Sequence, residues 1–181
     1  KFGVFEVGMS KSGEIHNLSG LIKPHIGIIT NIGEAHIENF KNIKGIAKAK
    51  SEIIENIKAG GTVILNRDDK FFNYLSKKAK KYKLKISTFG KHKDADFRIE
   101  KIIDLDSKSK VFIKIKEIRI SFIIGEINIY NVLASLAILE KLNLDYLKVL
   151  TKFKNFTPPE GRGKKYTISR YKKKFKFIDE S

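Results

Sequence analysis

The sequence predicts an α/β domain in which a mostly parallel sheet carries helices on both faces and an antiparallel meander at its edge. Short apolar runs rich in β-branched residues alternate with helical periodicity over the first half of the chain. This order is typical of a parallel sheet covered on both faces. Farther along, three segments alternate apolar and polar residues between turns, as antiparallel strands with one solvated face do.

The first half of the chain predicts strands and helices in turn. Residues 2–8 and 25–31 are apolar runs that indicate buried strands, and "GEIHNLSGLI" between them has helical spacing. A helix over 42–58 follows and ends at the glycines of "AGG". A strand at "TVILN", a lysine-rich helix over 69–82 and a strand at "LKISTFG" complete this half.

The second half predicts the meander, a pair of helices and two closing strands. The alternating segments are "DFRIEKIIDLD", "KVFIKIK" and "EIRISFII", with a turn at residues 106–109. A long amphipathic helix over about 128–144 follows Gly125 and leads into a second helix that ends near Phe153. "TPPEGRG" indicates a loop. We expect one domain over residues 1–181, and both ends of the chain read as cuts through a longer protein.

Composition excludes several classes of protein. The chain has no cysteine, which excludes disulfides and thiolate metal sites and fits a reducing cytoplasm. It has no run of about 18 apolar residues, so we expect no membrane span. The net charge of +17 raises the alternative of a lysine-rich nucleic-acid-binding module. However, 32 of the 37 basic residues are lysine and 28 residues are isoleucine, whereas base reading and bidentate phosphate contacts favour arginine.

One lysine is out of place in the predicted helix over 42–58. The apolar stripe of this helix consists of Ile43, Ile46, Ile53, Ile54 and Ile57, and the other lysines lie off it. Lys50 lies in the middle of the stripe, four residues after Ile46 and three before Ile53. Its stem could extend to the surface, its ammonium could pair with a buried acid, or it could be functional.

Two further residues favour a functional role for Lys50. His36 lies just beyond a predicted buried strand, and Glu6 occupies the end of another, among apolar neighbours where a bare charge is costly. Ligands of parallel α/β sheets collect at the carboxyl ends of the strands. A carboxylate, an imidazole and a lysine that meet at this edge could together bind a metal ion and phosphate.

An ordered set of motifs resembles the Mur ligase family. The motifs are "EVGMSKSGEI", "TNIGEAHIENF", "AKAKSEI", "VILNRDD", "GEINIYNVLAS" and "PPEGRG". The resemblance spans nearly the whole chain and implies the central, ATP-binding domain with its P-loop NTPase-like fold. It implies an ATP-dependent, amide-forming ligase of bacterial peptidoglycan precursor synthesis, acting in the cytoplasm. D-alanyl-D-alanine would be added to UDP-N-acetylmuramoyl-tripeptide through an acyl phosphate, and we expect a monomer.

The resemblance also implies roles for individual residues. Glu6 and His36 would be magnesium ligands, and Lys50 would be the carbamylated lysine of the family, which gives His36 and Lys50 a part in catalysis. Burial on an apolar stripe lowers a lysine pKa and populates the neutral amine that captures carbon dioxide. The resulting carbamate offers the hard oxygen donors that Mg²⁺ prefers.

The nucleotide contacts carry over in the same way. Asn128 and Asn131 match asparagines that meet the adenine, and Arg162 matches an arginine that contacts ATP. A helix cap, a surface amide and a solvated loop arginine are the structural alternatives for these three. "NRDD", residues 66–69, follows a strand as in the family, although a turn and a helix cap would explain it equally well.

Parts of the enzyme are expected outside this chain. The loop G-x-x-x-x-G-K-[ST] that cradles phosphates is not in the sequence, and the resemblance puts it upstream of "EVG". The UDP-binding amino-terminal domain and the carboxyl-terminal domain would also lie outside, so we expect the chain to be inactive alone. A sister ligase, which adds another amino acid or glutamates to folate, is the alternative within the family. Ligases that add D-alanyl-D-alanine usually carry histidine before the first asparagine, whereas this chain has Ile127, and some sister ligases have an apolar residue there.

Overall fold

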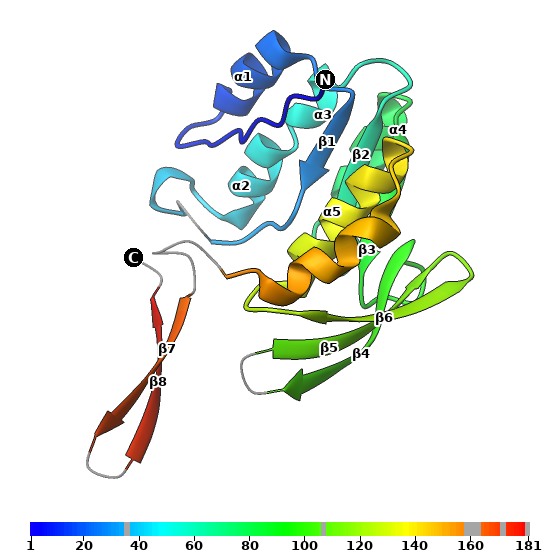
Figure 1. Cartoon of the computed structure of the whole chain (residues 1–181). Coiled ribbons are helices and arrows are strands. Elements are labelled where there is room, and N and C mark those ends of the chain that lie inside the picture. Colours follow the sequence, from blue (N-terminus) through cyan, green and yellow to red (C-terminus); the bar gives the residue numbers. More distant parts are fainter. Residues whose placement is uncertain (35–36, 106–107, 158–163, 171–172, 180–181) are drawn as a thin grey trace.

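The computed structural model describes residues 1–34, 37–105, 108–157, 164–170 and 173–179 (Figure 1). Helical segments are α1 (Glu14–Ile22), η1 (Ile37–Asn39), α2 (Ile43–Lys50), α3 (Ile53–Asn56), α4 (Phe72–Lys81), α5 (Ile129–Lys141) and η2 (Tyr146–Asn155), where η denotes a 3₁₀ helix. Strands are β1 (Ile26–Ile29), β2 (Thr62–Asn66), β3 (Lys85–Gly90), β4 (Phe97–Leu105), β5 (Lys108–Ile115), β6 (Ile118–Ile124), β7 (Lys164–Arg170) and β8 (Lys173–Asp179).

The main sheet joins a parallel half to an antiparallel half. Its six strands follow the chain in the order β1-β2-β3-β4-β5-β6. β1 to β4 run parallel, with a short β3–β4 contact, and β4, β5 and β6 form the antiparallel meander. β7 and β8 form a separate hairpin that stands apart from this body (Figure 1). The predicted fold class is therefore confirmed.

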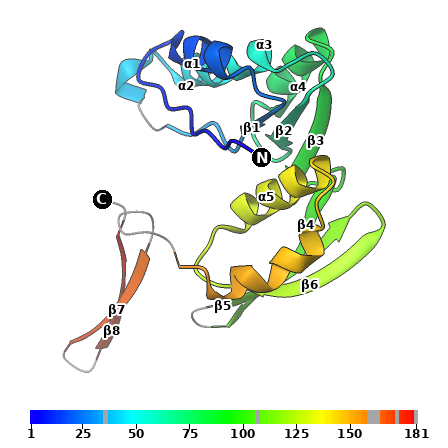
Figure 2. The same cartoon turned by 45° about the horizontal axis from the view of Figure 1, so that its top comes forward.

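Alternate side chains of β2 point to opposite faces of the parallel half of the sheet. Val63 and Leu65 pack with the helices α1 to α4, whereas Ile64 packs with α5 and η2 on the opposite face. Figure 2 shows the two helical layers on either side of β1, β2 and β3. All three side chains are fully buried, and each contributes about 1.5–3 kcal/mol by leaving water.

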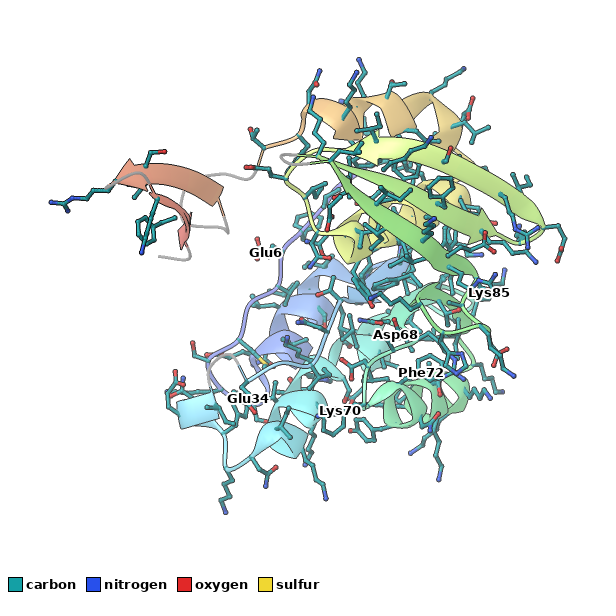
Figure 3. The ribbon with its side chains drawn as sticks, turned by 90° about the horizontal axis from the view of Figure 1, so that it is seen from below. Glu6, Glu34, Asp68, Lys70, Phe72 and Lys85 are labelled. Atoms are coloured by element: carbon teal, nitrogen blue, oxygen red, sulfur yellow. The ribbon has the colours of Figure 1, made fainter. Side chains whose placement is uncertain are left out.

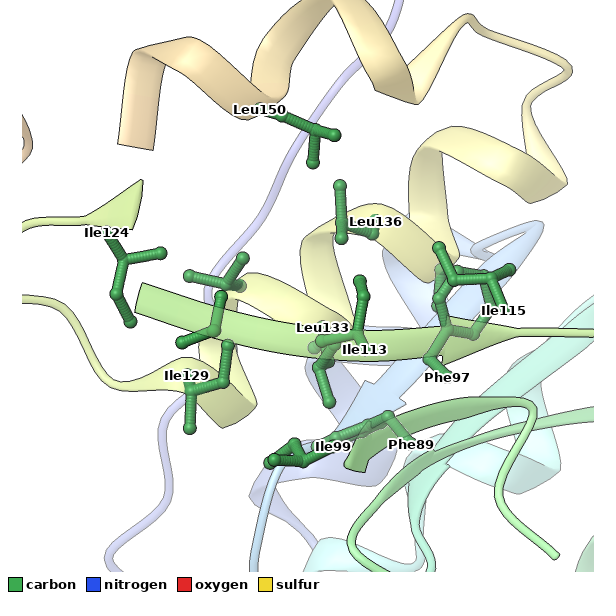
Figure 4. Close-up of a cluster of buried hydrophobic side chains, with 14 of the residues drawn as sticks. Phe89, Phe97, Ile99, Ile113, Ile115, Ile124, Ile129, Leu133, Leu136 and Leu150 are labelled. Carbon is green, nitrogen blue, oxygen red and sulfur yellow. The ribbon is translucent and has the colours of Figure 1, made fainter. Parts of the chain in front are cut away.

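The second layer fixes α5 against the junction of the two half-sheets. Leu133 and Leu136 of α5 pack with Ile113 of β5 and Phe89 of β3, and Leu150 of η2 closes the cluster (Figure 4). Tyr130, in the first turn of α5, contacts Phe89 near the end of β3 and Asp68 just after β2, so the amino end of α5 lies at the carboxyl end of the parallel strands. None of the helices described is long and apolar enough to cross a lipid bilayer.

The predicted strand over residues 2–8 is wrong. These residues have no regular secondary structure, and Phe2, Val4 and Phe5 are 67%, 95% and 64% exposed. Met9 is the first buried side chain of the chain. Apolar, branched composition favours a strand, but it does not supply the neighbouring strand whose hydrogen bonds a ladder requires.

The predicted single helix over 42–58 is divided. Asn42 caps α2 by accepting a hydrogen bond from the backbone N–H of Gly45, as a helix start requires. At Ser51 and Glu52 the bonds change to the shorter 3₁₀ spacing, since Glu52 donates to Ala49 and Ile54 donates to Ser51. The side chains of Ser51 and Glu52 form other bonds here, and the chain continues as the short helix α3.

Candidate functional site

The loops that follow β1 and β2 meet at the carboxyl edge of the parallel strands. The carboxylate of Asp69 accepts hydrogen bonds from the backbone N–H of Ile32 (2.7 Å) and of Phe71 (2.8 Å). One side chain therefore ties the β1 loop to the start of α4. The side-chain amide of Asn66 adds a second tie by donating to the carbonyl oxygen of Thr30 (3.2 Å).

Lys50 reaches the same edge from the carboxyl end of α2. Its side chain is half-buried, and Nζ donates to the carbonyl oxygen of Asn31 at 2.9 Å. Burial lowers the pKa of the Lys50 amine, and the nearby Asp69 carboxylate partly opposes this shift. Lys48, which the stripe places outside it, is exposed. The amine that the stripe singles out thus faces the sheet edge and not the far side of its helix.

Asp68 connects the β3–β4 loop to α5. Its carboxylate accepts hydrogen bonds from the backbone N–H of Lys91 (2.6 Å) and of His92 (2.8 Å) and from the hydroxyl of Tyr130 (2.9 Å). Burial, with the bond to Asp68, raises the pKa of Tyr130 to about 12. The protonated phenol donates this bond, and the first turn of α5 belongs to this edge.

Of the two residues expected beside Lys50, Glu6 lies in the described part of the chain and His36 does not. Glu6 is exposed on the N-terminal segment and lies apart from Asp68 (Figure 3), so the prediction that it ends a buried strand is wrong. His36 lies outside the described residues, and the convergence of the three stays a prediction. The described ranges hold no cluster of three His, Asp or Glu side chains that could bind a metal ion.

Two of the three residues expected to contact the nucleotide lie in the described part of the chain. The side chain of Asn128 accepts a hydrogen bond from the backbone N–H of Tyr130 at 2.9 Å, so it caps α5. Asn131 is exposed one residue further along. Arg162 lies outside the described residues.

Sequence reasoning did not assign the roles of Asp69 and Tyr130. Both belong to quoted motifs, "VILNRDD" and "GEINIYNVLAS", and the two aspartates directly follow a buried strand. That position at a carboxyl edge is the signal that could have identified Asp69. Nothing in the sequence pairs Tyr130 with Asp68, because 62 positions separate them.

Together, the fold and this edge define an α/β domain with a mostly parallel sheet, whose carboxyl edge carries a half-buried lysine, two aspartates and the amino end of a helix. The chain belongs to the Mur ligase family, since the model of the Mur ligase middle domain matches residues 1–139.

Relatives and solved structures agree with this family. The chain is 33% identical to UDP-N-acetylmuramoyl-tripeptide--D-alanyl-D-alanine ligase of Bacillus subtilis over 140 residues. The aligned region is 76% of this chain and 29% of that protein. A crystal structure of MurF from Acinetobacter baumannii superposes with a TM-score of 0.81 and 25% sequence identity. The superposed region is 96% of this chain and 37% of the MurF chain. MurF ligase from Thermotoga maritima, solved in complex with ADP, has the same fold, with a TM-score of 0.75 and 22% identity. The superposed region is 89% of this chain and 37% of that ligase chain. The chain spans about a third of the length of these proteins.

Proposed function

We propose that this chain is the central domain of a bacterial, cytoplasmic ligase that uses ATP to join D-alanyl-D-alanine to UDP-N-acetylmuramoyl-tripeptide. The observation that carries the proposal is the similarity to the Bacillus subtilis ligase of that name over 76% of this chain. The position of Lys50 at the carboxyl edge supports it, because this edge is where parallel α/β sheets bind their ligands.

Lys50 is suited to act as a carbamate. Partial burial favours the neutral amine, which is the form that attacks carbon dioxide. In that reaction the amine nitrogen forms a bond to carbon and loses a proton, and the product is an anion with two oxygen donors. The side chain already points to the β1 loop, so these oxygens would lie at the sheet edge, close to Asn31 and Asp69.

The proposed magnesium site forms around Lys50. Lys50 as a carbamate, with Glu6 and His36, would hold the ion, and the bound ion would neutralise charge on the phosphates of ATP. Glu6 is exposed, on a segment that forms no strand ladder. Asp69 holds the β1 loop in place through Ile32, and this loop leads to Gly33 and on to His36.

The nucleotide would be bound by Asn128, Asn131 and Arg162, and the phosphate loop would come from another part of the protein. In the reaction, a carboxylate oxygen of the tripeptide attacks the γ-phosphorus of ATP, the bond from that phosphorus to the bridging oxygen of ADP breaks, and the products are an acyl phosphate and ADP. The amine of D-alanyl-D-alanine then attacks the acyl carbon and phosphate leaves. This chain contributes mainly positioning and charge neutralisation.

The test is ligation by the full-length protein. With ATP, magnesium, UDP-N-acetylmuramoyl-tripeptide and D-alanyl-D-alanine, we expect phosphate release that requires all four components. Replacing D-alanyl-D-alanine by glutamate or diaminopimelate, or supplying folate with glutamate, tests the sister ligases. Turnover with one of these and none with D-alanyl-D-alanine would overturn the assignment. The 181-residue chain alone should not hydrolyse ATP, because it has no phosphate loop.

A further inference from the structure

Tyr130 lies between the capping residue Asn128 and Asn131 of α5, and both its backbone and its side chain are anchored. Its backbone N–H donates to the side chain of Asn128, and its hydroxyl donates to Asp68 at 2.9 Å. Its ring also meets Phe89 of β3 edge-on, with the centroids 6.4 Å apart. These contacts fix the first turn of α5 relative to the edge of the sheet. Asn131 is the next residue along the chain, so its position is fixed with that turn.

Asp68 is itself held by the β3–β4 loop. It accepts two backbone N–H bonds, from Lys91 and His92. Gly90 before them has φ 148°, and a Cβ atom there would lie 2.7 Å from the Asp68 carboxylate. Glycine therefore lets the loop approach the carboxylate closely enough for both N–H groups to bind it.

The opposite end of α5 has a comparable tie that serves as a reference. The ammonium of Lys116, at the β5–β6 turn, donates to Glu140 at 2.7 Å, near the carboxyl end of the helix. Both ties join α5 to a loop through one side-chain hydrogen bond. Only the Asp68–Tyr130 tie adjoins the exposed amide of Asn131.

We propose that the Asp68–Tyr130 hydrogen bond positions the nucleobase end of the nucleotide site: it fixes the first turn of α5, and with it the amide of Asn131, against the β3–β4 loop. Asp68 and Tyr130 are positioning residues that act through Asn131. The proposal rests on the proposed function, since that function assigns Asn131 to the adenine. It predicts that breaking the bond weakens nucleotide binding and lowers the preference for adenine over guanine.

The experiment measures equilibrium binding of ADP and GDP by calorimetry, using the full-length protein at a fixed magnesium concentration. Tyr130→Phe removes only the donor hydroxyl, and we expect its Kd for ADP to rise about fivefold, as for loss of one ordinary hydrogen bond. The preference for ADP over GDP should fall. Asp68→Ala should act in the same direction, and the double variant should bind no more weakly than Asp68→Ala alone, because the two changes remove one shared bond.

Glu140→Gln is the matched control, because it weakens the tie at the other end of α5. It should leave the Kd for ADP and the preference for ADP over GDP within twofold of wild type. The proposal is overturned if Tyr130→Phe also stays within twofold, if both variants lose affinity equally without a change in base preference, or if the wild-type protein does not bind ADP. A protein that binds ADP, responds to Tyr130→Phe and yet fails to ligate would refute the proposed function while supporting this inference.

Discussion

The amine of Lys50 lies 2.9 Å from the carbonyl oxygen of Asn31, so a side chain from the end of α2 contacts the loop that follows β1. This contact explains why a lysine occupies the apolar stripe of its helix. The aliphatic stem is covered by the body of the domain while the nitrogen is delivered to the ligand-binding edge. Burial of the amine lowers its pKa there, and the charge of Asp69 partly opposes this shift.

The pKa of Lys50 should lie below its ordinary value of 10.5 and fall further in Asp69→Asn. The Asp69 carboxylate attracts the ammonium and so raises this pKa, which means that its removal lowers it. More of the amine is then neutral at any pH below that pKa. The measurement is competitive amine labelling against pH, followed by mass spectrometry of the peptide that carries Lys50.

Asp104→Asn is the control for this titration, because Asp104 lies in β4 and hydrogen-bonds Ser109 in the meander. It should leave the labelling curve of Lys50 unchanged. A curve that Asp69→Asn does not shift, or shifts to higher pH, would contradict the electrostatic account of this site.

Gly90→Ala should destabilise the protein by about 1–3 kcal/mol. Gly90 has φ 148°, and the added methyl group would meet the Asp68 carboxylate at 2.7 Å. The measurement is urea unfolding of the protein. Gly20→Ala is the matched control: Gly20 lies inside α1 and its Cβ would have only ordinary contacts with Asn56. Alanine there should stabilise the protein by up to about 1 kcal/mol. Equal effects of the two substitutions would refute the claim that the positive φ of Gly90 and the nearby Asp68 carboxylate require glycine there.

Glu52→Ala should destabilise the protein by about 1–3 kcal/mol. Glu52 is 9% exposed, and its carboxylate accepts hydrogen bonds from the backbone N–H groups of Gly13 and His16 and from the Ser12 hydroxyl. Without it, the start of α1 loses its acceptor. In the same urea unfolding experiment, Glu117→Ala should cost less than about 0.5 kcal/mol, because Glu117 forms only an exposed pair with Lys114. A Glu52→Ala variant as stable as Glu117→Ala would show that the cap contributes nothing.

Much of the fold follows from local pattern. The alternation of β1, α2, β2, α4 and β3 and the meander after it were predictable, because each segment carries its own hydrophobic period. The failures depend on partners distant in sequence. Residues 2–8 have the composition of a strand, yet no ladder forms, and the helix over 42–58 divides where Glu52 turns to the start of α1.

The site was predictable to a similar extent. Lys50 was recognisable because a charge on an apolar stripe conflicts with its surroundings. Asp68 and Asp69 look alike in sequence, but one joins Tyr130 and the other joins Ile32. That division depends on which loops the sheet brings together, and no local pattern contains it.

Lys50 variants of the full-length protein address the central claim, that this lysine acts as a carbamate in an ATP-dependent ligase. Lys50→Ala should leave the fold intact and lower turnover on the order of a thousandfold, as for loss of a metal ligand in phosphoryl transfer. Added short carboxylic acids should restore part of the activity by filling the space of the carbamate. Lys48→Ala, which changes an exposed lysine of the same helix, should have near-normal turnover.

The most direct measurement is the turnover of Lys50→Arg beside wild type and Lys50→Ala, at saturating magnesium and substrates. Guanidinium stays protonated and cannot take up carbon dioxide, so the account predicts that the arginine variant is as inactive as the alanine variant. Near-normal turnover of Lys50→Arg would mean that the site needs a positive charge, and it would contradict the carbamate.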